Sequence, residues 1–245
     1  MTRVIFLADA HLRGPADTNQ QCLLEFLEAQ TADVLVLVGD MFEYLAGRNY
    51  AAEDAYRPVL EALARFPRLH FFEGNHDFDL SPEIPGLGSC RLWPGGGLLT
   101  LDDRHVWVTH GDRASPWDLG TRLLRQALQS RPLRLLRDRV LPQSWLFRFA
   151  LEFAGWSRRG FWPGRQQEAV HARRRAWRQG LAAGAQAVVF AHTHVALLQR
   201  AGPLLLANPG PAVRGGSYLE LAGGVFSLRS MPDGKILPPG ELELD

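Results

Sequence analysis

Short apolar runs alternate with amphipathic stretches through the first half of the chain. The runs Val4–Leu7, Val34–Val38 and Leu69–Phe72 consist mainly of Val, Leu, Ile and Phe, as strands buried on both faces do. Between them, residues 20–30 and 51–66 place apolar side chains at helical spacing, and Pro67 is expected to end the second stretch. Strands that alternate with helices in this way predict a parallel sheet.

The rest of the chain changes character twice. Residues 86–108 contain Gly and Asp turn signals and predict hairpin-like strands, whereas residues from about 116 to 180 have helical spacing and are crowded with Arg, Leu and Trp. Short strands then return at Ala187–Phe190, Ala196–Gln199, Leu204–Leu206, Ser217–Leu221 and Val225–Leu228. We therefore predict an α/β sandwich of two facing sheets with helices outside, as one domain of residues 1–245 with a helical insert at about 116–180.

Composition narrows the possible partners and location. With 245 residues, 46% hydrophobic residues and a net charge of +1, the chain has no long-range field to attract polyanions, so no nucleic-acid partner is expected. Two cysteines are too few for a disulfide framework. No apolar stretch approaches the ~20 residues of a membrane-spanning helix, and no signal peptide is visible. We expect a cytoplasmic protein that at most touches a membrane from that side.

Polar motifs follow five of the predicted strands directly. Carboxyl ends of parallel strands meet at one edge of a sheet, and ligands bind in that crevice. Each motif alone could be no more than a polar turn, but five of them in this order and position favour a shared site. The motifs are Asp9-Ala10-His11, Gly39-Asp40-Met41-Phe42-Glu43, Gly74-Asn75-His76-Asp77, His110-Gly111-Asp112 and His192-Thr193-His194.

These motifs supply a mixed nitrogen and oxygen ligand set without thiolates, which suits two divalent ions such as Mn, Fe or Zn. Asp40 is the predicted bridge, because a carboxylate can hold two cations about 3.5–4 Å apart. A water between the ions would be acidic enough to act as hydroxide in an in-line displacement, which suits phosphate-ester or pyrophosphate hydrolysis. One metal would take Asp9, His11, Asp40 and His194, and the other Asp40, Asn75, His110 and His192.

Three further polar residues lie beside the expected ligands. His76 could donate a proton to the leaving oxygen or stabilise charge on the phosphoryl group. His76 and Asp40 are therefore the predicted catalytic residues. The alternative is a structural histidine that orients a neighbour. Asp77 and Asp112 are expected to fix the tautomers of metal-binding histidines.

The ordered motifs resemble those of the calcineurin-like metallophosphoesterase superfamily. Within it, Phe42-Glu43 and Phe78 make the chain most similar to UDP-2,3-diacylglucosamine hydrolases of lipid A biosynthesis. This resemblance implies an αββα sandwich with a helical lid, in which the insert is the lid. It implies hydrolysis of the pyrophosphate of UDP-2,3-diacylglucosamine to lipid X and UMP, usually with manganese, at the inner face of the membrane.

The insert agrees with an acylated substrate. Trp145, Phe149 and Phe153 recur at helical spacing and form an apolar face, with Arg148, Arg158, Arg159 and Arg165 around it. The alternative is that this stripe packs on the main sandwich. By position, Asp118 and Ser157 match substrate contacts of the family, whereas Phe161 and Gly164 lack the polar side chains that the family has at those positions. The other residues expected to bind substrate are Asn75, His76, Arg158 and His192.

Other departures leave rival functions open. Many family members have Arg where this chain has His76, and Ala191 replaces the usual Gly before His192. A metallophosphoesterase of the same fold could act on another phosphodiester or nucleotide diphosphate, and a non-catalytic scaffold is the rival from a different class. Scaffolds of this kind usually lose metal ligands, and this chain has all seven. The sequence does not indicate an oligomeric state.

Overall fold

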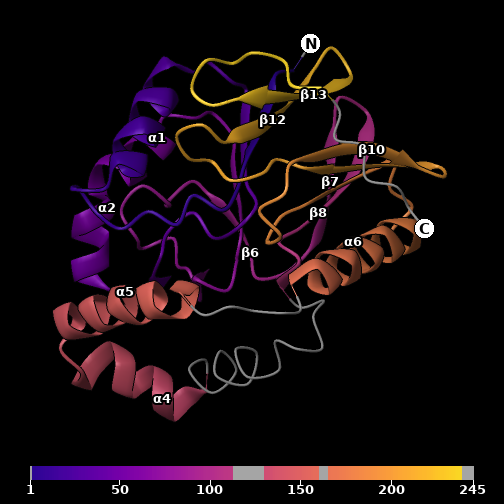
Figure 1. The fold of residues 1–245 in the computed structure, drawn as a ribbon. Coiled ribbons are helices and arrows are strands. Elements are labelled where there is room, and N and C mark those ends of the chain that lie inside the picture. The colour runs from indigo at the N-terminus through magenta and orange to yellow at the C-terminus, as the bar shows by residue number, and fades with distance from the viewer. Residues whose placement is uncertain (1, 113–129, 160–164, 239–245) are drawn as a thin grey trace.

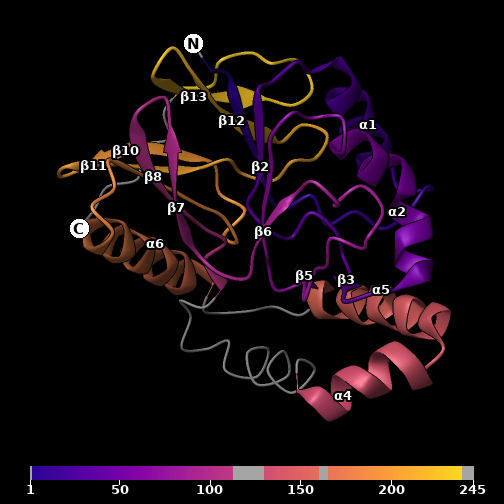
Figure 2. The same cartoon turned by 180° about the vertical axis from the view of Figure 1, so that it is seen from behind.

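Two β-sheets lie face to face, with helices on the outer side of each (Figures 1 and 2). The computed structural model describes residues 2–112, 130–159 and 165–238. In the first sheet the strand order is β13-β12-β1-β2-β4-β6, and the last four of these strands are parallel to one another. Its strands are β1 (Val4–Leu7), β2 (Val34–Leu37), β4 (Leu69–Phe72), β6 (Arg91–Trp93), β12 (Ser217–Ala222) and β13 (Val225–Ser230).

The second sheet has the order β10-β11-β9-β8-β7, in which β8, β9 and β11 are parallel and the two edge strands are antiparallel. A two-stranded sheet of β3 and β5 joins two of the loops that leave the first sheet. These strands are β3 (Leu45–Ala46), β5 (Asp77–Phe78), β7 (Gly97–Leu101), β8 (Arg104–Thr109), β9 (Ala187–Phe190), β10 (Leu197–Ala201) and β11 (Leu204–Asn208).

Helices α1 (Thr18–Ala29) and α2 (Tyr50–Leu63) cover the first sheet, and α6 (Arg165–Ala182) covers the second (Figure 1). The first two begin at capping side chains, because Asp17 and Asn49 accept hydrogen bonds from free backbone amides of the first turn. The strands β1, β2 and β9 are buried along their whole length, since both of their faces are covered.

The predicted layered α/β sandwich is confirmed, with one difference in strand pairing. The segment 86–108 contains the expected hairpin, β7 and β8, but β6 leaves it and pairs in parallel with β4 in the other sheet. Arg91–Trp93 therefore belongs to a different sheet from the hairpin that follows it. The local residue pattern identifies a strand but does not choose its partner, so periodicity alone does not predict this crossing.

Helix α4 (Arg131–Leu135), a π-helical turn η3 (Leu136–Val140) and α5 (Gln143–Arg159) lie below the sandwich, where α5 runs beside β3 and β5 (Figure 2). Phe147 of α5 packs edge-on against Tyr56 of α2, with ring centroids 5.7 Å apart. No helix in the described ranges is long and apolar enough to cross a membrane. The predicted insert at about 116–180 includes both α5, which contacts α2, and most of α6, which packs on the second sheet. Its boundaries stay a prediction.

Candidate metal centre

The loops that follow β1 and β2 run side by side below the first sheet. The amides of Asp9, His11 and Leu12 donate to the carbonyls of Gly39, Asp40 and Met41 at 3.1, 3.0 and 3.1 Å. These bonds continue the parallel pairing of the strands into the loops. Two of the predicted motifs are therefore held in register by backbone contacts.

The backbone is left-handed at five of the seven predicted ligands. Asp and His tolerate this conformation better than most residues do, because short polar side chains can bond locally, but it remains uncommon outside glycine. It turns each side chain sharply away from its strand. The φ angles are 53° for Asp9, 45° for His11, 54° for Asp40, 70° for His192 and 56° for His194.

Six of the seven predicted ligands form two of the three candidate metal-binding groups among the described residues, and the third group is His11, Glu43 and His76. Asp9, His11 and His194 form one group, in which His11 Nε2 lies 3.3 Å from His194 Nε2 and Asp9 Oδ1 lies 3.9 Å from the same His194 atom. Asp40, His110 and His192 form the other, and within each group the potential ligand atoms lie within 4.8 Å of one another. The division of the ligands between two metal ions stays a prediction.

Asp40 lies between these groups. Its Oδ2 atom is 3.8 Å from His11 Nε2 in the first group and 3.3 Å from His110 Nε2 in the second, while its Oδ1 accepts a 2.9 Å hydrogen bond from the His76 amide. Asn75 Oδ1 lies 3.3 Å from His110 Nε2, so it joins the second group. This placement suits a bridging carboxylate, and the assignment of individual ligands stays a prediction.

Two glycines allow the loops to approach this closely. A Cβ atom on Gly74 would lie 2.1 Å from Asp40 Oδ1, and one on Gly39 would lie 2.6 Å from His110 Nδ1. Gly39 also has a φ of 84°, which a side chain would strain. Any larger residue at either position would push Asp40 or His110 out of the centre.

The ring of His110 is oriented by the backbone. Its Nδ1 lies 2.8 Å from the Val38 carbonyl, which can only accept, so Nδ1 carries the proton and Nε2 is left to face Asp40 and a cation. Asp77 does not fix this tautomer, and the expectation that it would do so is wrong. Its buried carboxylate instead accepts from the backbone amides of Asp40, Met41, Phe42 and Gly74.

Glu43 was not among the predicted site residues, although it occupies a central place. Its side chain is fully buried, and Oε1 lies 3.8 Å from His11 Nδ1 and 3.4 Å from His76 Nδ1. The other carboxylate oxygen is 3.7 Å from Arg13 Nε. Glu43 thus links a predicted ligand to the predicted catalytic histidine. The Phe42-Glu43 pair is the signal that the sequence offers, but by itself it indicates only the family.

Burial and neighbouring charges set the electrostatics of the centre. Burial raises the pKa of Asp9. For Asp40, burial acts in the same direction, but the nearby His110 and His76 lower its pKa well below the usual value. Burial opposes charge on His110, yet the Asp40 carboxylate raises its pKa to about 10. Without a cation, the second group is therefore an ion pair between Asp40 and protonated His110.

The donor set fits divalent cations. Buried carboxylates and imidazole nitrogens gather in adjacent groups, and positive charge from metal ions would replace the proton that His110 otherwise holds. Oxygen and nitrogen donors are compatible with Mn, Fe or Zn, so they do not select among these metals.

The predicted substrate contacts are only partly placed. Asn75, His76 and His192 lie at the metal centre. Ser157 and Arg158 fall in the last turns of α5, where side chains are not described, and Asp118 lies outside the described residues.

A layered αββα sandwich with candidate metal ligands clustered at its strand ends is typical of metal-dependent phosphoesterases. The model of the calcineurin-like phosphoesterase family matches residues 2–196 of the chain. This match covers well over half of the sequence. The chain belongs to the calcineurin-like phosphoesterase family, as its motifs predicted.

Curated relatives are similar over a shorter region. The UDP-2,3-diacylglucosamine hydrolase of Aeromonas salmonicida is 30% identical over 140 residues, which cover 54% of this chain and 54% of the relative. The protein of the same name from Chromohalobacter salexigens is 33% identical over 114 residues, 44% of this chain and 46% of the relative. The chain therefore spans about half the length of the curated relatives that it matches.

Solved structures of the same fold are more distant in sequence. Yfce, a phosphoesterase from E. coli, superposes with a TM-score of 0.52 at 16% identity, covering 96% of this chain and 97% of that one. Vps29 from Entamoeba histolytica in complex with zinc gives a TM-score of 0.50 at 14% identity, with 96% of each chain covered. At these identities the likeness supports the fold alone.

Proposed function

We propose that this protein hydrolyses the pyrophosphate bond of UDP-2,3-diacylglucosamine to give lipid X and UMP, with two divalent metal ions. The observation that supports this reaction most directly is the pair of ligand groups around Asp40 beside a helix with an exposed aromatic face. The names of the curated relatives point to the same substrate. The ligand groups suit a diphosphate, and the exposed aromatic face suits acyl chains.

The aromatic face is a stacked ladder on α5. Trp145, Phe149 and Phe153 are 57%, 53% and 51% exposed, and the centroids of successive rings lie 5.6 and 6.2 Å apart. The alternative that this stripe packs on the sandwich is therefore wrong, and Phe147 makes that contact instead. Exposed apolar surface of this extent marks a binding surface for an apolar partner.

The ladder belongs to a helix that is joined to the metal-binding loops. Arg13, two residues after His11, donates a 2.9 Å hydrogen bond from its guanidinium to the Leu151 carbonyl of α5. Gln143 at the start of α5 accepts from the Tyr50 amide at 2.6 Å. Acyl chains on α5 and a diphosphate at the centre could therefore belong to one molecule.

His76 has the geometry to act on the substrate. Its Nδ1 donates to the Glu43 carbonyl at 2.9 Å, so Nε2 remains for a phosphate or leaving-group oxygen, and the side chain is 29% exposed. The chemistry that two divalent cations supply in such a site is acidification of a water molecule and neutralisation of phosphate charge. We assign His76 to charge stabilisation or proton donation at the leaving oxygen.

The proposed setting is the cytoplasmic face of the inner membrane, where an acylated substrate would be available, with manganese as the metal. The exposed aromatic ladder next to the exposed Arg148 supports contact with an anionic, apolar surface.

The proposal is tested by comparing two substrates. Manganese-loaded protein should release UMP from UDP-2,3-diacylglucosamine much faster than it cleaves bis-p-nitrophenyl phosphate, which has a reactive phosphodiester but no acyl chains. Comparable rates, or activity only on the second compound, would assign the centre to another phosphoester. An Asp40→Ala variant serves as the control for contaminating phosphatases.

A further inference from the structure

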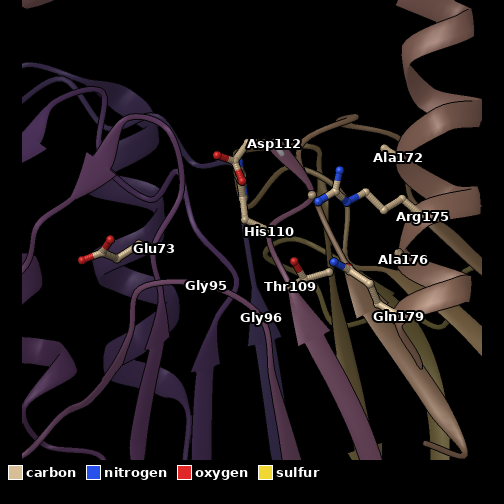
Figure 3. Close-up of a pocket in the computed structure, with 11 residues that line it drawn as sticks. Glu73, Gly95, Gly96, Thr109, His110, Asp112, Ala172, Arg175, Ala176 and Gln179 are labelled. Carbon is tan, nitrogen blue, oxygen red and sulfur yellow. The ribbon is translucent and has the colours of Figure 1, made fainter. Parts of the chain in front are cut away.

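A small polar cavity opens beside the metal centre, on the side of the second sheet. It lies between α6 and the loops that follow β4, β6 and β8, and its volume is about 110 Å³ (Figure 3). The predicted metal ligand His110 forms part of its wall. A group bound in this cavity would therefore be directly next to whatever is bound at the centre.

The cavity wall combines groups that can only accept hydrogen bonds with groups that can only donate them. Glu73 and Asp112, both buried, are acceptors when ionised, and Arg175 is a donor. Thr109 and Gln179 can do both. Figure 3 shows Arg175 and Gln179 extending from α6 towards Asp112 and Thr109.

The two donors on α6 are available for a ligand. Neither the Arg175 guanidinium nor the Gln179 side-chain amide makes a hydrogen bond or ion pair within the described ranges. Other arginines near the centre are engaged, since Arg13 contacts Glu43 and the Leu151 carbonyl, and Arg137 bonds Asp79. The amide and the guanidinium lie four residues apart on one helix face, so they can reach the same ligand.

The charges of the wall disfavour a phosphate in this cavity. Figure 3 shows the Asp112 carboxylate near the Arg175 guanidinium, so an anion would be repelled as well as attracted, whereas Glu73 turns away and accepts from the Leu80 amide. The volume is far below the roughly 300–1,000 Å³ of a site for a whole drug-sized molecule, so the cavity suits one ring rather than a nucleoside or an acyl chain. A neutral group with several hydroxyls satisfies both kinds of wall residue, because each hydroxyl donates to a carboxylate and accepts from Arg or Gln.

We infer that this cavity binds the ribose of a ribonucleotide substrate through its vicinal hydroxyls. The inference rests on the proposed function in one respect, since the nucleotide half of a UDP-sugar supplies such a ribose beside the diphosphate. In the proposed substrate the ribose is also the ring with two adjacent free hydroxyls. Arg175 and Gln179 donate to the diol, and Asp112 accepts from it.

The test is calorimetric binding of two nucleotides to the manganese-loaded protein. UMP should bind about 10- to 100-fold more tightly than 2′,3′-dideoxyuridine 5′-monophosphate, because hydrogen bonds to charged groups are lost in the second compound. Arg175→Met should weaken UMP binding towards that of the dideoxy compound and leave the affinity for the dideoxy compound unchanged. Arg178→Met is the matched control, because Arg178 is an arginine on the same helix that does not line the cavity.

Equal affinities of the wild-type protein for the two nucleotides would overturn the inference, as would a preference that survives in Arg175→Met or is lost equally in Arg178→Met. Undetectable binding of UMP would also overturn it. The failure of the proposed function is a separate result. If the protein prefers UMP as expected but does not hydrolyse UDP-2,3-diacylglucosamine, the ribose site stands and serves another ribonucleotide substrate.

Discussion

Replacing Phe149 by serine should impair hydrolysis of the acylated substrate and lower the stability of the protein less than replacing Phe147 on the same helix. Phe149 is the middle ring of the α5 ladder and stacks on both of its neighbours, yet 53% of it is exposed. Half of its surface is therefore not used for folding. If acyl chains cover this surface, its removal affects binding of the substrate rather than folding.

The magnitude follows from the exposed area. An aromatic side chain can bury about 200 Å², so roughly 100 Å² of Phe149 is available to a ligand. At about 25 cal/mol per Å², covering that area contributes at most about 2.5 kcal/mol. Since about 1.4 kcal/mol corresponds to a factor of ten, Phe149→Ser should reduce kcat/KM for the acylated substrate by up to roughly 60-fold.

The assay measures UMP release from UDP-2,3-diacylglucosamine and, in parallel, cleavage of bis-p-nitrophenyl phosphate. Phe149→Ser should reduce only the first activity, and it should lower Tm less than a substitution of Phe147 does, because among the described residues Phe149 packs only against its two neighbouring rings. Phe147→Ser is the matched control on the same helix, because Phe147 packs against Tyr56 and the first-sheet core. It should lower stability by about 2–3 kcal/mol and Tm by roughly 5–10 °C. Unchanged kinetics in Phe149→Ser, or equal losses on both substrates, would refute acyl binding by the ladder.

Three further predictions concern the metal centre. Asp40→Ala should remove at least one metal ion per chain by elemental analysis and abolish turnover, and retention of both would show that Asp40 is not the bridge. Asp77→Ala should lower the free energy of unfolding by about 3–5 kcal/mol in denaturant titrations, because four backbone amides lose their acceptor, and an unchanged value would contradict that role. Because His110 has a pKa raised to about 10, metal binding at pH 8 should release about one proton from it, and metal affinity should fall as pH falls. Calorimetry in buffers of different ionisation enthalpy measures the release, and binding heats that do not depend on the buffer would exclude it.

The fold and the membership of the site could be predicted because both depend on local pattern and chain order. The runs Val4–Leu7 and Val34–Val38 indicated buried parallel strands, and the structure has them at Val4–Leu7 and Val34–Leu37. Motifs that follow parallel strands of one sheet share an edge of that sheet, which groups Asp9, Asp40 and Asn75 after β1, β2 and β4. His110, His192 and His194 follow β8 and β9 of the second sheet, so they join the first three only because the two sheets lie face to face.

The supporting contacts could not be predicted in this way, because they depend on which loops pack together. Glu43 lies near His11 because the loops after β1 and β2 pair with each other, and near His76 because β3 pairs with β5. Asp77 directly follows His76 in the sequence, and yet its carboxylate faces the backbone of the β2 loop. Sequence spacing gives the neighbours of a side chain along the chain, but it does not give its direction.

The backbone, rather than the cations, sets the positions of the ligands. Left-handed conformations at non-glycine residues cost on the order of 1–3 kcal/mol each, and five of the seven candidate ligands adopt them. Backbone hydrogen bonds between the loops offset that cost, for example Asp9 N to Gly39 O and His11 N to Asp40 O. These bonds do not involve the side chains of the candidate ligands. A substitution such as Asp40→Ala therefore removes a candidate metal ligand and its bond to the His76 amide, while the backbone bonds between the first two loops remain. Loss of metal without loss of the fold is the result that this arrangement requires.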